Sequence, residues 1–129
     1  MDANEYILID SNIIIYTGLG NQGQLRKWLK NYSPVVSAVS QIEVLGYWKL
    51  TKKDKYYFET FFSNLKVIPI NEEVIEEAIA LKQMKSMSLG DSIIAATAIL
   101  ENIPLLTANS KDFSPIKNLE LIDLEKIQK

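Results

Sequence analysis

Apolar residues in this chain gather in short continuous runs, which alternate with longer segments where apolar positions recur every three or four residues. The runs lie at 6–9, 34–37, 67–68, 104–107 and 119–122. Short apolar runs bounded by turn residues are typical of strands, and the first two are apolar enough to be buried on both faces. Strands that alternate with helices predict a mostly parallel central sheet of about five strands, with the last run at an edge. We therefore expect an α/β fold of three layers, α/β/α, with residues 1–129 forming a single domain.

The helical periodicity predicts which side chains face the core. Helices are expected at 13–16, 24–31, 39–50, 56–65 and 92–101, with one more that Asn71 caps and that ends near Lys85. The polar segment 52–55 is expected to be a loop. In the helix at 39–50 the predicted inward side chains are Ile42, Leu45 and Trp48. After Asn71 the predicted apolar face consists of Val74, Ile75, Ala78, Ile79 and Leu81.

The chain contains neither histidine nor cysteine. This excludes Ser-His-Asp and Cys-His nucleophilic sites, disulfide bonds, and zinc sites built from imidazole or thiolate ligands. A hydrolase of this composition depends on carboxylates, lysines, tyrosines and hydroxyls, and carboxylates favour hard cations such as Mg2+ or Mn2+. No apolar run approaches the ~20 residues of a membrane span. A chain without cysteine suits a reducing compartment, so we expect a cytoplasmic protein with no membrane segment.

Polar side chains follow two of the predicted strands. Asp10 comes directly after the strand at 6–9, and Asn109 and Asp112 follow the strand at 104–107. Ligands of parallel sheets bind beyond the carboxyl ends of the strands, so these side chains are candidates for a site. Each has a plainer interpretation: Asp10 as a helix N-cap, and Asn109 and Asp112 as turn residues.

Two further acids lie on predicted helices. Glu43 shares a helical face with Val39 and Gly46, and on this otherwise uncharged face Gly46 is expected to leave room for the carboxylate. The alternative is an ordinary solvated glutamate. Asp91 stands three residues after Ser88, which is the spacing of a capping box. The same spacing also places a carboxylate at the start of a helix, flanked by small residues.

Several carboxylates at one site repel one another unless a cation offsets their charge. A divalent metal ion does so, and it also lowers the pKa of a bound water and stabilises charge on a phosphate group. One metal ion or two would both be compatible with these residues.

Positive charge is clustered although the net charge is −2. The chain is therefore not a nucleic-acid binder of the strongly basic kind. The clusters are Arg26, Lys27 and Lys30 in one segment and Lys49, Lys52, Lys53 and Lys55 in another. These clusters are either solvated helix faces or a surface that binds phosphates beside the acidic centre.

Four segments, in order, resemble the motifs of the PIN-domain family. They are 9–16, with Asp10, Ser11 and Asn12 after a hydrophobic strand; 37–45, with Glu43 as the acidic member; 90–98, which begins Gly90-Asp91; and 106–113, which reads Thr-x-Asn-x-x-Asp-Phe from Thr107. No single motif is specific, but the four together cover nearly the whole chain. Length and motifs are most similar to VapC-type toxins of type II toxin–antitoxin modules.

The resemblance implies a PIN-like fold and a Mg2+- or Mn2+-dependent endoribonuclease that cuts tRNA, rRNA or mRNA. It implies a homodimer silenced by a small antitoxin whose tail enters the active-site groove. By carry-over, Asp10, Glu43 and Asp91 would hold the metal, and Asn109 or Asp112 would complete its shell directly or through water. Ser11, Asn12 and Thr107 would orient the site. Family members often carry an acid at the position of Asn109, and here the chain departs from the pattern.

Other classes of protein also fit part of the pattern. A haloacid-dehalogenase-type phosphatase has an aspartate after its first strand but needs a second one two residues later, where this chain has Asn12. A receiver domain needs an acidic pair near its start and a late lysine after a strand, and neither pattern is evident. The alternative outside enzymology is a catalytically silent PIN-like module that binds RNA or protein. Such a module would not need Asp10, Glu43 and Asp91 together.

Overall fold

The computed structural model describes residues 5–127 and contains five strands and eight helices over this range. Along the chain they are β1 (Tyr6–Ile9), α1 (Ser11–Thr17), α2 (Gly23–Leu29), β2 (Ser33–Ser37), α3 (Ala38–Leu45), α4 (Lys52–Ser63), β3 (Lys66–Ile68), α5 (Glu72–Met84), α6 (Leu89–Glu101), β4 (Leu105–Thr107), α7 (Ser110–Phe113), β5 (Leu121–Asp123) and α8 (Leu124–Ile127). Of the helices in this range, none has the length and apolar character that crossing a membrane requires.

All strand pairs are parallel, and the strand order is β3-β2-β1-β4-β5. In the central strand β1, Leu8 lies opposite Val35 of β2 on one side and Leu105 of β4 on the other. The predicted parallel sheet of about five strands is confirmed, and the strand predicted at 119–122 is the edge strand β5, displaced slightly along the chain. Because β1 and β4 are neighbours, the residues that follow them meet at one edge of the sheet.

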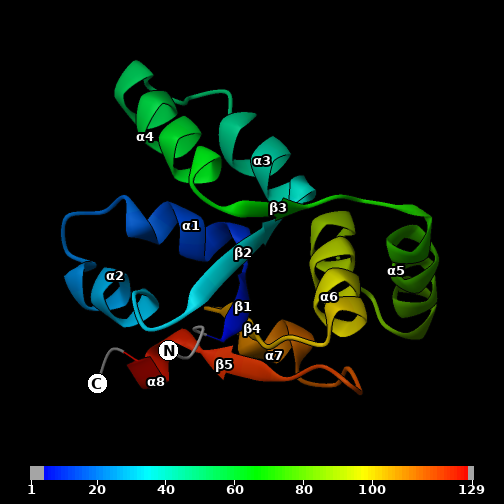
Figure 1. The fold of residues 1–129 in the computed structure, drawn as a ribbon. Coiled ribbons are helices and arrows are strands. Elements are labelled where there is room, and N and C mark those ends of the chain that lie inside the picture. Colours follow the sequence, from blue (N-terminus) through cyan, green and yellow to red (C-terminus); the bar gives the residue numbers. More distant parts are fainter. Residues whose placement is uncertain (1–4, 128–129) are drawn as a thin grey trace.

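Helices cover both faces of the sheet. Successive side chains of a strand point to opposite faces, so β1 contributes Leu8 to one core and Ile7 and Ile9 to another. The first core is closed mainly by α5 and α6, and the second by α1, α2 and α4. Figure 1 shows α5 and α6 on one side of the strands and α1 and α2 on the other. The predicted three-layer α/β/α architecture is thus confirmed.

The helix predicted at 39–50 is shorter than expected and turns a different side to the core. It ends at Leu45, where the backbone N–H of Gly46 closes the last turn on the Ile42 carbonyl oxygen at 2.8 Å. Leu45 packs against the core as predicted. The inward orientation of Ile42 and Trp48 was wrong, since these side chains are 68% and 83% exposed. The buried side of α3 is set by the elements it packs against, chiefly α1, α4 and α6, and Trp48 lies beyond its end.

The segment predicted as a loop at 52–55 is the first turn of α4. The side chain of Thr51 accepts a hydrogen bond from the Asp54 N–H at 3.1 Å and is the N-cap of this helix. Threonine is a favourable N-cap, and this signal was missed because the lysines around Asp54 suggested a solvated loop.

The start of α5 agrees with the prediction, but its apolar face is narrower. Asn71 is the N-cap and accepts a hydrogen bond from the Val74 N–H at 3.0 Å. Val74 is buried, together with Ala78 and Leu81, whereas the predicted core residues Ile75 and Ile79 are exposed. One narrow stripe of α5 packs on the first core, and the two isoleucines lie beside this stripe.

Candidate active site

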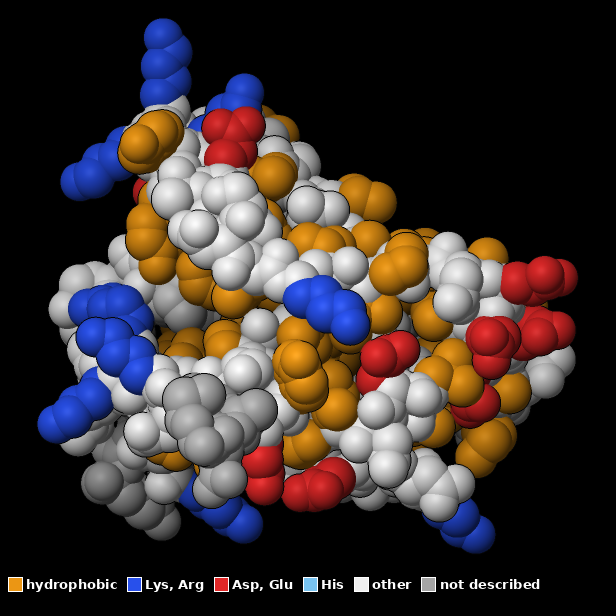
Figure 2. Space-filling model, in the orientation of Figure 1, with side chains coloured by type: hydrophobic (Ala, Val, Ile, Leu, Met, Phe, Trp, Pro, Cys, Tyr) orange, Lys and Arg blue, Asp and Glu red, His pale blue; other side chains and the backbone are white. Residues whose placement is uncertain are grey.

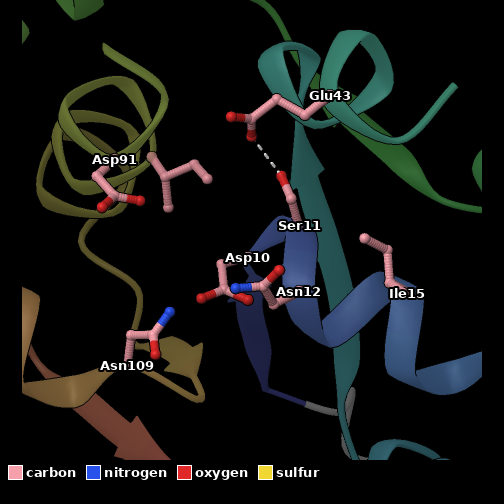
Figure 3. Close-up of a pocket in the computed structure, with 8 residues that line it drawn as sticks. Asp10, Ser11, Asn12, Ile15, Glu43, Asp91 and Asn109 are labelled. Carbon is pink, nitrogen blue, oxygen red and sulfur yellow. Dashed lines mark hydrogen bonds between the residues drawn. The ribbon is translucent and has the colours of Figure 1, made fainter. Parts of the chain in front are cut away.

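A pocket of about 210 Å3 opens at the carboxyl edge of the sheet, beside the ends of β1 and β4. It is lined by Asp10, Ser11, Asn12, Ile15, Glu43, Asp91, Ile94 and Asn109. Figure 3 shows that the polar members come from four places: the end of β1 with the start of α1, helix α3, the start of α6, and the segment after β4. The six polar residues of this lining all belong to the predicted site, so the fold brings them together in one cavity.

Asp10 is held rigidly at the base of this pocket. One carboxylate oxygen, Oδ1, accepts the Ile13 N–H at 2.9 Å and so caps α1. The other, Oδ2, accepts the Thr107 hydroxyl at 2.6 Å, and the Thr107 oxygen in turn accepts the Asn109 N–H at 3.0 Å. Burial raises the pKa of Asp10 above its ordinary 3.8, with a further rise from the charge of Asp91, against the hydrogen bonds from Thr107 and Ile13. Asp10 is thus both a helix cap and a lining residue of the pocket.

Glu43 reaches the pocket from α3 and is oriented by a serine of α1. The Ser11 hydroxyl donates to Glu43 Oε1 at 2.6 Å and also lies 2.9 Å from Ser40 Oγ (Figure 3). Glu43 as a whole is exposed, as in the alternative of a solvated glutamate, but its carboxylate lies over the backbone of Gly90 in α6. A Cβ atom at Gly90 would overlap that carboxylate, so Gly90 provides its space.

Gly46 does not provide the space that was predicted for the Glu43 carboxylate. A Cβ atom at Gly46 would collide with the Ile42 carbonyl oxygen of its own helix turn. The prediction failed because spacing along one helix identifies neighbours only within that helix, whereas the glycine that matters lies on the facing helix α6.

Asp91 faces Asp10 across the pocket from the first turn of α6 (Figure 3). Its backbone N–H donates to the Ser88 hydroxyl oxygen at 3.1 Å, which is one half of the capping box expected from the spacing. Partial burial raises the pKa of Asp91 above 3.8, and the nearby charges of Asp112 and Glu43 raise it further, against a hydrogen bond from Ser88.

The structure separates the two candidates at the end of β4. Asn109 lines the pocket, and in Figure 3 its amide is turned toward Asp10. Asp112, on α7, lines an adjoining pocket of about 280 Å3 together with Asp123 and Glu125, although its charge is still felt at Asp91. Of the two, only Asn109 lines the pocket that contains Asp10, Glu43 and Asp91.

The donors of this pocket fit a hard divalent cation in kind. Carboxylate oxygens from residues 10, 43 and 91 converge on it with one amide, which is a ligand set that a hard cation prefers. Burial is the main cause of the raised pKa of Asp10 and Asp91, and the neighbouring carboxylates raise it further, so a bound cation would offset their repulsion. As the side chains stand, residues 5–127 contain no group of three or more carboxylates placed to hold a metal ion. Glu43 is the member that can move, because its long side chain is exposed and only the hydrogen bond from Ser11 fixes its end.

Comparison with known proteins identifies the family. The sequence profile of the PIN domain matches residues 7–119. This chain belongs to the PIN-domain family. The match spans all four segments that resembled the family's motifs, so the resemblance is confirmed. A comparison with curated protein sequences finds no significant match.

Solved structures with this PIN-domain fold include chains of toxin–antitoxin complexes. A chain of a complex from Klebsiella pneumoniae is 28% identical, with 90% of this chain and 95% of that chain covered and a TM-score of 0.75. A chain of VapBC2 from Rickettsia felis, bound to a DNA fragment from its promoter, is 25% identical, with coverages of 92% and 98% and a TM-score of 0.77. VapBC-1 from nontypeable Haemophilus influenzae, at 23% identity, coverages of 96% and 99% and a TM-score of 0.76, shares the fold.

Sequence reasoning missed several residues of this site. Ser40 Oγ lies 2.9 Å from the oxygen of Ser11, the residue that donates to Glu43. Its position three residues before Glu43 on the same helix was the available signal. Gly90 was noted only as a small neighbour of Asp91. Ile15 and Ile94 form the apolar part of the lining, and the sequence placed them only within the predicted helices at 13–16 and 92–101.

Proposed function

We propose that this chain is a metal-dependent endoribonuclease and the toxin of a type II toxin–antitoxin module. The observation that carries the proposal is the convergence of Asp10, Glu43 and Asp91, which lie far apart in the sequence, on one pocket at the carboxyl edge of the sheet. An acidic pocket repels phosphate unless a cation offsets its charge, so phosphodiester chemistry here calls for a bound metal.

In this proposal Asp10, Glu43 and Asp91 would hold Mg2+ or Mn2+, with Asn109 contributing an amide oxygen. When bound, such an ion lowers the pKa of a water molecule and stabilises charge on the phosphate group. The chain's own residues prepare the site. Thr107 and the Ile13 N–H fix both oxygens of Asp10.

Orientation of the remaining donors falls to side chains around them. The Ser11 hydroxyl holds Glu43, and Gly90 leaves the space that the Glu43 carboxylate occupies. Asn12 lies at the rim of the pocket beside Asp10, where it can contact a substrate group (Figure 3). Asp112 acts through its charge on Asp91.

The likeness to chains of toxin–antitoxin complexes supports an antitoxin as the protein partner. We infer that the antitoxin blocks the acidic pocket, that the toxin is a homodimer, and that its substrates are tRNA, rRNA or mRNA in the cytoplasm. Co-expression with the product of any small open reading frame adjacent to the gene, followed by copurification, tests the partnership. A chain that is harmless alone and binds no such product would contradict the toxin assignment.

The nuclease is tested by incubating the purified chain with total RNA in Mg2+, in Mn2+ and in EDTA. Discrete products that need the metal and disappear in Asp10→Asn are the expected result. Glu73→Gln, a carboxylate of α5 outside the pocket, is the matched control and should cleave like the wild type. Equal products from the wild type and Asp10→Asn would indicate a contaminating nuclease.

A catalytically silent PIN-like binding module is the second candidate. It is favoured by the present side-chain arrangement, in which no three carboxylates of residues 5–127 stand ready to hold an ion. A binder should tolerate Asp10→Asn with unchanged RNA affinity and should show no cleavage with either metal. Membership of the PIN-domain family disfavours the phosphatase alternative.

A further inference from the structure

Three large aromatic side chains stand in solvent at one end of the molecule. They belong to residues 47–56, the α3–α4 tip, where α3 ends and α4 begins. Trp48 is 83% exposed, Tyr56 74% and Tyr47 54%, and none of them packs on either core. The other tryptophan, Trp28, packs against the second core and lies 4.3 Å from the Tyr32 ring, centroid to centroid. Packing within the fold therefore does not account for the aromatic residues of the tip.

The same tip concentrates positive charge. Lys49 Nζ lies 4.8 Å from the centre of the Trp48 ring, and Lys52, Lys53 and Lys55 are exposed in the first turn of α4. In Figure 2 blue side chains lie over the start of α4, with a red one beside them, and a second blue group lies over α2. A group of red side chains lies over α5 at the opposite side. Lysines in a first turn oppose the helix dipole, so helix stability does not explain them. Their charge is suited to an anionic partner.

A depression joins this tip to the acidic pocket. An apolar groove of about 310 Å3 is lined by Ile15, Glu43, Val44, Tyr47, Leu50, Asp54 and Phe58. It shares Ile15 and Glu43 with the acidic pocket and includes Tyr47 of the tip. A polymer that places a phosphate beside Glu43 can thus continue along this groove to Tyr47, the residue next to Trp48 in the tip.

Exposed aromatic rings together with lysines favour a single-stranded nucleic acid as the ligand of the tip. Bases stack on aromatic side chains when their faces are free, and lysines attract the phosphates between them. In a duplex each base face is covered by the next base pair, so paired RNA offers the rings nothing to stack on. We propose that the α3–α4 tip is a subsite outside the acidic pocket, on which unpaired bases of the substrate stack. This inference rests on the proposed ribonuclease function.

The test measures binding of a fluorescein-labelled 12-nucleotide RNA of mixed sequence, free or annealed to its complement, in EDTA by fluorescence anisotropy. Two variants of one residue separate stacking from simple apolar contact. Trp48→Phe keeps an aromatic face and should bind the single strand nearly as well as the wild type. Trp48→Leu keeps apolar area without a ring and should bind it about 5- to 150-fold more weakly. The Trp48 side chain is solvent-exposed in the wild type, so neither substitution should affect folding.

The lysines are tested through salt dependence. For single strands the slope of log K against log salt concentration falls by about 0.7 per phosphate contact, so Lys52→Gln/Lys55→Gln should reduce it by about 1.4. Lys117→Gln, an exposed lysine outside the tip, should leave the slope unchanged. In cleavage assays Trp48→Leu should raise KM with little change in kcat, as expected for a residue that binds substrate away from the reacting atoms.

Three results would overturn the inference. They are equal affinity of Trp48→Leu and wild type for the single strand, equal or tighter binding of the duplex, and a change of oligomeric state in Trp48→Leu by light scattering, which would make the tip a protein contact. The proposed nuclease survives all three if cleavage still depends on metal and Asp10. Conversely, weak binding by Trp48→Leu without any metal-dependent cleavage supports the tip and contradicts the nuclease.

Discussion

Replacing Gly90 by alanine should raise stability and lower activity at the same time. Gly90 is the second residue of α6, and its backbone does not adopt a positive φ that would require glycine. The three atoms nearest to an added Cβ all belong to the Glu43 carboxylate, one of them too close to remain where it is. That carboxylate is the free end of a flexible side chain, so Glu43 can move while the helix stays in place.

The sizes of the gain in stability and of the loss of activity both follow from these contacts. Exchanging glycine for alanine in a helix stabilises it by about 0.5–1 kcal/mol, which raises the Tm of a domain this size by roughly 2–5 °C. Displacement of Glu43 breaks its hydrogen bond with Ser11, but Glu43 is exposed and water replaces that bond at little cost. Misplacing a metal-binding group or its support typically lowers metal affinity or activity by about 10- to 100-fold.

The assay pairs thermal unfolding with metal-dependent RNA cleavage. Gly23→Ala is the matched control, because Gly23 opens α2 and its nearest side-chain atom, on Arg26, is 3.9 Å from the added Cβ. It should gain stability without losing activity. In a Glu43→Ala background, Gly90→Ala should cause no further loss of cleavage, since both changes act on one side chain.

Two outcomes would refute this reasoning. Full activity of Gly90→Ala would mean that the position of the Glu43 carboxylate over α6 is not required. A lower Tm than the wild type would mean that the collision is relieved by moving the helix rather than the side chain of Glu43.

The remaining predictions concern the buried carboxylate and the metal. The pKa of Asp10 in the folded protein lies above the unfolded value of 3.8. The protonated Asp10 side chain therefore contributes fully to stability below pH 3.8, and this contribution is lost as the pH rises through the raised pKa. Asp10→Asn in EDTA should therefore melt at a higher temperature than the wild type at pH 7, the difference vanishing near pH 4; a lower Tm at pH 7 would contradict the burial argument. Thr107→Val removes the hydroxyl that donates to Asp10 and accepts the Asn109 N–H, and it should cost about 1–3 kcal/mol in urea unfolding, whereas Ser63→Ala on the exposed side of α4 should cost little. At a Mg2+ concentration of 100 times Kd the wild type should gain about 2.7 kcal/mol and Asp10→Asn much less, and equal shifts would exclude the pocket as the metal site.

Much of this protein follows from local pattern in the sequence. The run at 6–9 is apolar on every residue and ends in Asp10, which predicts a strand buried on both faces with a polar group at its carboxyl end, and β1 is the central strand. Caps are equally local, since Asn71 and Ser88 hydrogen-bond to backbone groups three residues away. The order of strands and helices, with the four motifs in sequence, was sufficient for the three-layer fold and the PIN-domain family.

What local pattern left open depends on contacts between elements. Whether Ile42 or Val44 is buried on α3 follows from where α1 and α6 lie, and periodicity alone allowed both. The glycine that accommodates Glu43 is Gly90 on a facing helix, not Gly46 on its own. The choice between Asn109 and Asp112 at the pocket rests on the direction in which the chain leaves β4. In each case the deciding distance joins residues that are remote in sequence, and only the packed structure fixes it.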